Sequence, residues 1–251
     1  MEKIKIKNSL GGSIAAVIHY TKTDSNRLAV LCPGNLDSKD YDHLVLLAVA
    51  LAEHGYTVVR FDPTGTWESD GDISEYSITQ YLKDIKSVLD YMLEREAYID
   101  ILLGGHSRGG QLSILYAARD PRIALVLGIM PSSGTLTGKP REEWEKSGVR
   151  VSTRDLPNDR SKIRQFHLPF SHVLDRDLYD AENDIRKIRV PIILIAGELD
   201  AEILPEDVKI LYDNANEPKK YILVKDIGHN YRRNPFEIDT VNNEILKALS
   251  S

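Results

Sequence analysis

The 251-residue sequence contains one cysteine, no long apolar run and no block of basic residues. Cys32 alone excludes an internal disulfide and fits a reducing compartment, so we expect a cytoplasmic protein. The longest apolar run, residues 44–52, is nine residues long and too short to cross a bilayer, and the N-terminus lacks the apolar region of a secretory signal. The net charge of −6, without a lysine-arginine block, predicts no nucleic-acid partner.

Several cofactor and metal motifs are also missing. The sequence contains neither G-x-x-x-x-G-K-[ST] nor G-x-G-x-x-G, so it lacks the glycine-rich loop motifs that bind phosphates and dinucleotides. No H-E-x-x-H occurs, and His167 and His172 lie five residues apart without a paired ligand set. We therefore predict no cofactor and no metal site.

What the chain does contain is an alternation of short apolar strands with amphipathic helices. Residues 3–7 and 13–20 flank Gly11-Gly12 as a hairpin would. Ser77 and Gln80 form a candidate capping box before apolar positions that recur with helical period from residue 78 to residue 93. Six further segments are near-continuously apolar, as in buried parallel strands: 28–32, 56–61, 99–103, 123–129, 190–196 and 221–224. The pattern predicts one α/β domain over residues 1–251, with a mostly parallel, twisted sheet of about eight strands, an N-terminal antiparallel hairpin and helices on both faces.

The alternation is interrupted once, between residues 131 and 189. These 59 residues replace the usual short crossover, and so long a connection is usually functional. It contains Trp144, Phe166, Phe170 and Tyr179 among charged stretches that favour helix. We expect a small cap insertion over the carboxyl end of the sheet. Residues 139–164 of this insertion carry eight basic and five acidic residues, an excess that suits either an anionic substrate or a solvated helix face.

The segment Gly105-His106-Ser107-Arg108-Gly109 points to chemistry. It follows the apolar strand 99–103 and precedes a helix-forming stretch from Gln111. A G-x-S-x-G sequence at such a strand-to-helix turn predicts a nucleophilic serine on a strained elbow. The following helix directs N–H groups and its dipole toward the same point, which favours an anionic acyl-transfer intermediate.

The partners of Ser107 follow from chain order, which in this type of fold is serine, acid, histidine. Only His229 follows the late strands, so it is the candidate base. Asp200 follows the strand 190–196 and is the candidate acid, with Glu198 and Glu202 as rivals. Asp200 would fix the tautomer of the imidazole and stabilise its protonated form.

An oxyanion hole needs two N–H donors, one from the residue after the nucleophile and one from the loop after the third strand. Arg108 supplies the first. In the loop Cys32-Pro33-Gly34-Asn35-Leu36, proline has no N–H, so Asn35 is favoured for the second and Leu36 is the alternative.

These motifs make the chain similar to the α/β-hydrolases, and within them to the bacterial cinnamoyl/feruloyl esterase-like serine hydrolases. Besides the elbow, Gly197-Glu198-Leu199-Asp200 and Gly228-His229, the segment 62–71 is similar to the family's D-x-x-G-x-G-x-S-x-G. The chain departs from the family at Pro33-Gly34, where His-Gly is common, and at Trp67, which replaces the second glycine. Both departures concern substrate choice, and Trp67, Trp144 and Phe170 are the candidate substrate contacts.

The sequence thus predicts a serine carboxylesterase for small or aromatic esters, acting through an acyl-enzyme on a small-molecule substrate. The same triad serves amidases, peptidases and thioesterases, and a non-enzymatic ligand-binding protein is a further alternative. The oligomeric state stays open, with a homodimer possible.

Overall fold

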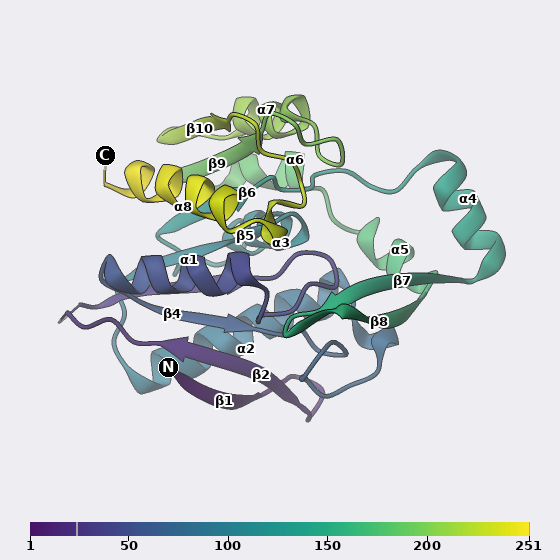
Figure 1. Ribbon diagram of the computed structural model, residues 1–251, viewed down its shortest axis with the longest axis horizontal. Helices are drawn as coiled ribbons and strands as arrows, with labels where there is room; N and C mark the ends of the chain where they lie inside the picture. The colour runs from purple at the N-terminus through teal and green to yellow at the C-terminus, as the bar shows by residue number, and fades with distance from the viewer. Residues whose placement is uncertain (24, 251) are drawn as a thin grey trace.

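The computed structural model describes residues 1–23 and 25–250, and the predicted domain 1–251 also includes Asp24 and Ser251, which lie outside the described residues. Eight strands form one sheet in the order β1-β2-β4-β3-β5-β6-β9-β10 (Figure 1). Among the described residues, β2 pairs antiparallel with β1 and β4, and the other pairs of neighbours in this sheet are parallel. The mostly parallel sheet with an antiparallel hairpin at one edge confirms the predicted fold class.

Each predicted strand begins within two residues of its expected start. The observed bounds are β1 (Glu2–Lys7), β2 (Ser13–His19), β3 (Arg27–Cys32), β4 (Tyr56–Phe61), β5 (Asp100–His106), β6 (Leu125–Ile129), β9 (Ile192–Gly197) and β10 (Lys219–Val224). The chain leaves β3 for β4 on one side of the sheet and later enters β5 on the other side. Loops therefore diverge beyond the carboxyl ends of β3 and β5, which is where ligands bind in open α/β sheets.

Helices cover both faces of the sheet (Figure 1). On one face α1 (Asp42–Glu53) and α8 (Pro235–Leu249) share a buried apolar cluster. On the other face α2 (Ile78–Arg95), α3 (Arg108–Ala117) and α7 (Pro205–Asn214) contribute to a second cluster. Two cores on a shared sheet explain why the central strands are apolar on both sides. No helix among the described residues is long and apolar enough to cross a membrane.

Helix α2 begins as predicted, but its capping box is only half formed. The Ser77 hydroxyl accepts a hydrogen bond from the Gln80 N–H at 3.0 Å. The Gln80 side chain does not return to Ser77; its amide donates to Asp84 at 2.8 Å instead. Asp84 is fully buried and accepts two further hydrogen bonds, from the N–H and the hydroxyl of Thr64, so the Gln80 amide is needed to satisfy this carboxylate and does not complete the cap.

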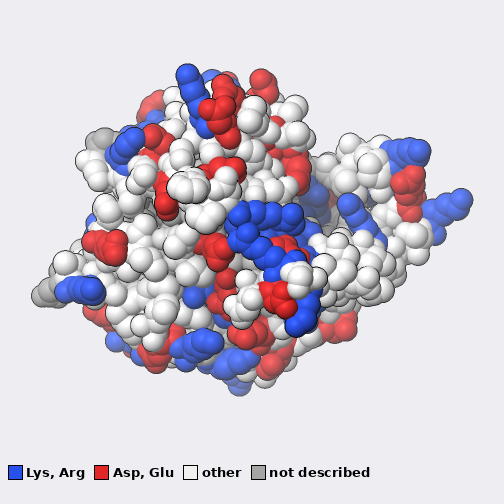
Figure 2. All heavy atoms as spheres, viewed as in Figure 1, with Lys and Arg blue, Asp and Glu red and all other residues white. Residues whose placement is uncertain are grey.

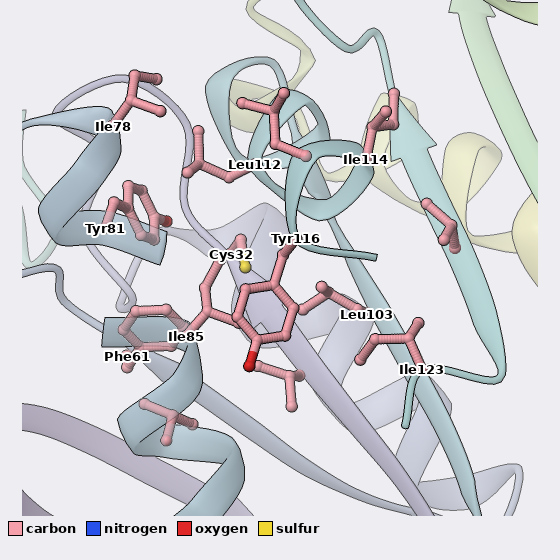
Figure 3. Close-up of a cluster of buried hydrophobic side chains, with 14 of the residues drawn as sticks. Cys32, Phe61, Ile78, Tyr81, Ile85, Leu103, Leu112, Ile114, Tyr116 and Ile123 are labelled. Carbon is pink, nitrogen blue, oxygen red and sulfur yellow. The ribbon is translucent and has the colours of Figure 1, made fainter. Parts of the chain in front are cut away.

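Cys32 lies in the core, at the end of β3. Figure 3 shows its sulfur among the side chains of Leu103, Leu112 and Tyr116. The thiol is free and fully buried, and burial raises its pKa. The residue therefore acts as a small packing group.

The insertion between β6 and β9 contains more strand than the sequence predicts. Its elements are α4 (Gly138–Ser147), β7 (Val149–Leu156), β8 (Asp159–Pro169), α5 (Ser171–Arg176), α6 (Ala181–Asp184) and a short 3-10 turn (Ile185–Lys187). The prediction of helix from the charged stretches is correct for α4 and wrong for 149–169, which form an antiparallel hairpin. In Figure 1 this hairpin and α4 project to one side of the sheet. Alternating Val149, Val151 and Thr153 favour strand, and this signal outweighs the charges between them.

The turn that carries the nucleophile depends on close packing against β3. A Cβ added at Gly109 would lie 2.0 Å from the carbonyl oxygen of Cys32, whereas one added at Gly134 would meet nothing within 4 Å. We predict that Gly109→Ala destabilises the fold by about 1–3 kcal/mol, as overpacking does, and that Gly134→Ala leaves stability unchanged within about 0.5 kcal/mol. Thermal unfolding of both variants measures this, and equal melting temperatures would contradict it.

Candidate active site

Ser107 occupies the turn between β5 and α3. Its φ of 53° and ψ of −115° lie outside the regions that side chains normally adopt. The turn is fastened by the Ser107 N–H, which donates to the Ile129 carbonyl at 2.9 Å. It also requires glycine at position 105, because an added Cβ there would lie 2.3 Å from the Cys32 carbonyl oxygen. The backbone therefore holds the serine hydroxyl clear of the sheet edge, as the elbow motif predicts.

The structure brings Ser107, His229 and Asp200 together from the ends of three strands. The Ser107 hydroxyl lies 3.1 Å from Nε2 of His229, and Nδ1 of His229 lies 2.7 Å from Oδ2 of Asp200. In the consistent tautomer, His229 Nδ1–H donates to Asp200 and Nε2 accepts from Ser107. This hydrogen-bonded chain is the arrangement in which a histidine can deprotonate a serine.

Asp200 is held in place by its second oxygen. Oδ1 accepts hydrogen bonds from the N–H groups of Glu202 at 2.9 Å and Ile203 at 2.8 Å. Burial opposes ionisation of this carboxyl, but the hydrogen bond with His229 and these N–H donors hold its pKa below the usual range. Asp200 is thus an oriented, ionised carboxylate.

The two rival acids face other partners. Glu198 is exposed and accepts from the Asp226 N–H at 3.1 Å. Glu202 accepts from the Asn230 amide at 2.8 Å and approaches His229 only at 3.9 Å, on the side of Nε2. Neither carboxylate contacts Nδ1, the nitrogen that an orienting acid must hold.

His106, beside the nucleophile, packs against His229. Their ring centroids lie 4.6 Å apart, and His106 is 3% exposed. Burial lowers the pKa of His106, so the ring is neutral and presents an apolar face to the candidate base.

One cluster has metal-ligand residue types. Ligand atoms of Asp37, His43 and His106 all lie within 4.8 Å of one another, and all three residues are buried. His106 Nδ1 and Asp37 Oδ2 are 4.0 Å apart, wider than the about 3.3 Å between ligands of a tetrahedral zinc. Tyr231 packs edge-on against both rings, so we assign the cluster a packing role.

The candidate oxyanion donors are the N–H groups of Asn35 and Arg108. Within residues 1–23 and 25–250, neither N–H has a hydrogen-bond acceptor. The N–H of Leu36, by contrast, donates to the Tyr76 hydroxyl at 3.2 Å. Of the two alternatives for the second donor, the geometry favours Asn35.

The loop that carries Asn35 is held by three further side chains. Tyr81 donates to the Pro33 carbonyl at 2.9 Å, and the indole N–H of Trp67 donates to the Leu36 carbonyl at 3.0 Å. Arg154, from β7, donates to the Asn35 carbonyl at 2.6 and 3.2 Å. No motif in the sequence points to Arg154, which belongs to the basic excess of the insertion. The Asn35 N–H itself belongs to the Gly34–Asn35 peptide, whose Gly34 carbonyl accepts from the Asp37 N–H at 3.1 Å. Both peptides that flank the Asn35 Cα are therefore hydrogen-bonded before substrate binds.

Two cavities meet at this site. The serine cavity, about 210 Å³, is lined by Ser107 and His229 together with Thr153 and Arg154 of the hairpin. The second cavity, about 270 Å³, shares Asn35, Arg154 and Glu202 with the first. The insertion therefore walls the space in front of Ser107.

The three predicted substrate contacts lie in different places. Trp144 lines the second cavity and stacks on His172 with ring centroids 6.0 Å apart. Trp67 and Phe170 line neither cavity. Trp67 instead supports the oxyanion loop, and Phe170 packs under the guanidinium of Arg141, 5.6 Å from its ring centroid.

Comparisons with known proteins indicate a hydrolase family. The sequence profile of the family described as "Serine aminopeptidase, S33" matches residues 23–165. Mouse palmitoyl-protein thioesterase ABHD10, a mitochondrial protein, is 26% identical over 180 residues, which cover 70% of this chain and 59% of the mouse protein. The chain thus spans less than two thirds of that relative.

Solved structures share the fold over the whole chain. Est1E from Butyrivibrio proteoclasticus with bound ferulic acid has a TM-score of 0.77 and 20% identity, covering 99% of this chain and 100% of Est1E. The mouse α/β-hydrolase domain-containing protein 10 has a TM-score of 0.75 and 21% identity, covering 100% of this chain and 99% of that structure. These matches confirm the predicted α/β-hydrolase fold.

The support of the oxyanion loop can be tested through Tyr76. We predict that Tyr76→Phe costs about 1–3 kcal/mol, because it leaves the buried Leu36 N–H without an acceptor. Tyr20→Phe, which removes a hydroxyl from an exposed tyrosine, is the control and should cost under about 0.5 kcal/mol. Urea denaturation of both variants gives the two free energies of unfolding; similar values would contradict the assignment.

Proposed function

Because the chain belongs to the serine aminopeptidase S33 family of hydrolases, we propose that Ser107, His229 and Asp200 are its catalytic triad and that it cleaves small or aromatic carboxylic esters. The hydrogen-bonded chain from Ser107 to Asp200 carries this proposal. A bound ester would lie in the serine cavity, walled by the insertion 131–189, which acts as a cap.

The reaction proceeds in two steps. His229 Nε2 takes the proton of Ser107 as the serine oxygen bonds to the ester carbonyl carbon, and the imidazolium then returns that proton to the departing alcohol. In the second step water gives one proton to His229 and its hydroxide to the acyl carbon. The Ser107 oxygen then leaves the acyl carbon and takes the proton back from His229. The products are one alcohol and one carboxylic acid.

The remaining groups stabilise charge during both steps. The N–H groups of Asn35 and Arg108 donate to the oxyanion of each tetrahedral intermediate, and Asp200 stabilises the imidazolium. A single oxyanion donor contributes roughly 10² to 10³ in kcat. The hydrogen bonds to the Gly34 and Asn35 carbonyls, on either side of the Asn35 Cα, support this role, because a loop held in this way needs little reorganisation as charge develops.

A thioester is the second candidate substrate, since the mouse relative is named a palmitoyl-protein thioesterase. Acyl transfer to Ser107 is the same for both, with a thiol leaving in place of an alcohol. We also propose a cytoplasmic location, which the single, buried, unpaired Cys32 supports.

Ser107→Ala tests the nucleophile. We predict loss of p-nitrophenyl butyrate hydrolysis by a factor of at least about 10³ and loss of labelling by a fluorophosphonate, because no other oxygen contacts His229 Nε2 within hydrogen-bond reach among the described residues. Ser132, another buried serine beside the elbow, bonds to Gln111, and Ser132→Ala should label like the wild type. Labelling of the Ser107→Ala variant would reject the proposal.

Asp200→Asn tests the acid. The amide would still accept at one oxygen but would present N–H to His229 Nδ1, which forces the wrong tautomer, and kcat should fall by roughly 10⁴. Glu198→Gln, at the exposed rival, should change kcat less than about twofold. Steady-state kinetics on p-nitrophenyl butyrate measure both values, and a larger loss at Glu198 would overturn the assignment.

A further inference from the structure

The second cavity at the site has an unusual lining. Four arginines border its about 270 Å³: Arg108 from α3, Arg150 and Arg154 from β7, and Arg176 from α5. We call it the arginine cavity. Figure 2 shows basic side chains gathered where the β7–β8 hairpin meets the body of the molecule. Among the residues that the structure describes, Glu202 is the only acidic one that borders this cavity.

Three of these arginines have no carboxylate partner. Within the described part of the chain, no acidic oxygen lies within ion-pair distance of Arg108, Arg150 or Arg176. Ten other arginines do have one, for example Arg122 with Asp120 and Arg232 with Asp155. Arg164, Arg186 and Arg189 also lack an ion pair among the described residues, but all three are exposed, so water can solvate their charges.

The guanidinium groups are also short of hydrogen-bond acceptors. Arg108 is 6% exposed, and its Nε is buried without a partner, as is the Nε of Arg176. One Arg108 nitrogen lies 3.2 Å from His172 Nε2, and His172 Nδ1 lies 2.8 Å from the Tyr76 carbonyl. His172 is therefore a neutral acceptor: burial, followed by Arg108, lowers its pKa to about 3. It supplies no negative charge.

Nearby acids are already engaged. Asp175 accepts from both the N–H and the hydroxyl of Thr79, and Asp177 pairs with Arg141 at 2.7 Å. Burial, and then repulsion by Arg108, lowers the pKa of Arg176 to about 10. Arg108 is buried and Arg176 is half-buried, whereas Arg150 is exposed. Cations withdrawn from water are normally paired, so Arg108 and Arg176 give the cavity the features of a site that an anionic ligand completes.

The position of the cavity indicates which part of a substrate it would hold. The leaving group must lie near His229, which lines the serine cavity but not the arginine cavity. The arginine cavity is bordered by Asn35 and Arg108, the residues of the two oxyanion donors. With the carbonyl oxygen at those donors and the leaving group at His229, the acyl chain points toward the arginines.

We propose that the arginine cavity binds a carboxylate at the far end of the acyl group, so that the preferred substrates are half-esters of short dicarboxylic acids. This inference rests on the proposed esterase function. Guanidinium forks match a carboxylate in geometry as well as charge. Arg154 holds the Asn35 carbonyl, and Arg108, Arg150 and Arg176 supply the donors. Arg176 also donates to the Gly134 carbonyl, which leaves its Nε without an acceptor. Trp144, which packs against Arg150 and His172, forms the wall along which the acyl chain lies.

A matched pair of esters tests the preference. Monoethyl glutarate and ethyl pentanoate share a leaving group and chain length and differ in the terminal carboxylate. We expect kcat/KM for the half-ester to exceed that for the neutral ester by at least about tenfold, with ethanol release as the readout. Arg176→Met should lower this ratio about tenfold or more, because a ratio cancels effects of the variant on folding or on the triad.

Controls separate the cavity from the general basic surface. Lys162→Met removes an exposed positive charge from the same hairpin, outside both cavities, and should leave the ratio unchanged. A preference that vanishes in 0.5 M NaCl, or that falls equally in Lys162→Met, would mean long-range steering and overturn the proposal. A greater preference for an ester with the carboxylate on its alcohol part would overturn the placement on the acyl side.

Direct binding distinguishes this inference from the proposed function. Calorimetry with glutarate on the Ser107→Ala protein should show binding that Arg176→Met weakens about tenfold or more. Glutarate binding without any ester turnover in the wild type would reject the esterase and keep the anion site. Turnover of ethyl pentanoate without glutarate binding or half-ester preference would reject the anion site and keep the esterase. Tighter binding of inorganic phosphate than of glutarate would reject the carboxylate as ligand.

Discussion

The close contact between the elbow and the end of β3 is the constraint on which the site depends. Gly105 and Gly109 let the backbone of the turn lie against the Cys32 carbonyl, with no room for a side chain. The same contact fixes the distance between the nucleophile, which leaves β5, and the oxyanion loop, which leaves β3. Because β3 and β5 are hydrogen-bonded neighbours, the strained serine and the Asn35 peptide are both set by one pair of strands. The strain at Ser107 persists because the sheet and α3 hold it from both sides.

Hydrogen bonds from three surrounding elements hold the oxyanion loop in place. The carbonyls of Pro33, Leu36 and Asn35 each accept a hydrogen bond from a side chain on a different element. The donors are, in the same order, Tyr81 of α2, Trp67 of the segment after β4 and Arg154 of the insertion. The insertion is therefore part of the construction of the oxyanion loop as well as a wall of the cavity. Arg232, which follows His229, binds Asp155 of the same hairpin at 2.8 Å. The hairpin thus joins the loop of the base to the loop of the oxyanion donors, which couples its position to the geometry of both.

Much of the site was predictable because it lies at strand ends. In a parallel sheet the residues that follow the strands meet at one edge, so Ser107, Asp200 and His229 could be selected by chain order and position alone. The hairpin 149–169 was not predicted, because its strands alternate charged residues with valine and threonine and are exposed on both faces over much of their length. The substrate side was predicted least well. An aromatic residue near a rim can equally support the structure, and Trp67 does so by donating to the Leu36 carbonyl.

The arginine cavity shows why a count of charges along the chain does not predict an anion site. Such a site depends on which of the charged side chains are paired in the fold. The basic excess in residues 139–164 was real, yet four of those cations, Lys139, Arg141, Arg160 and Lys162, are neutralised by acids at the surface. Only Arg150 and Arg154 of that stretch reach the cavity, where they meet Arg108 from the elbow and Arg176 from α5. A guanidinium in water is screened within about 10 Å, whereas a buried, unpaired one retains its field and its desolvation cost. The arginines that lack partners determine where an anion would bind. Which arginines lack partners is a property of the fold, and no short segment of the sequence contains it.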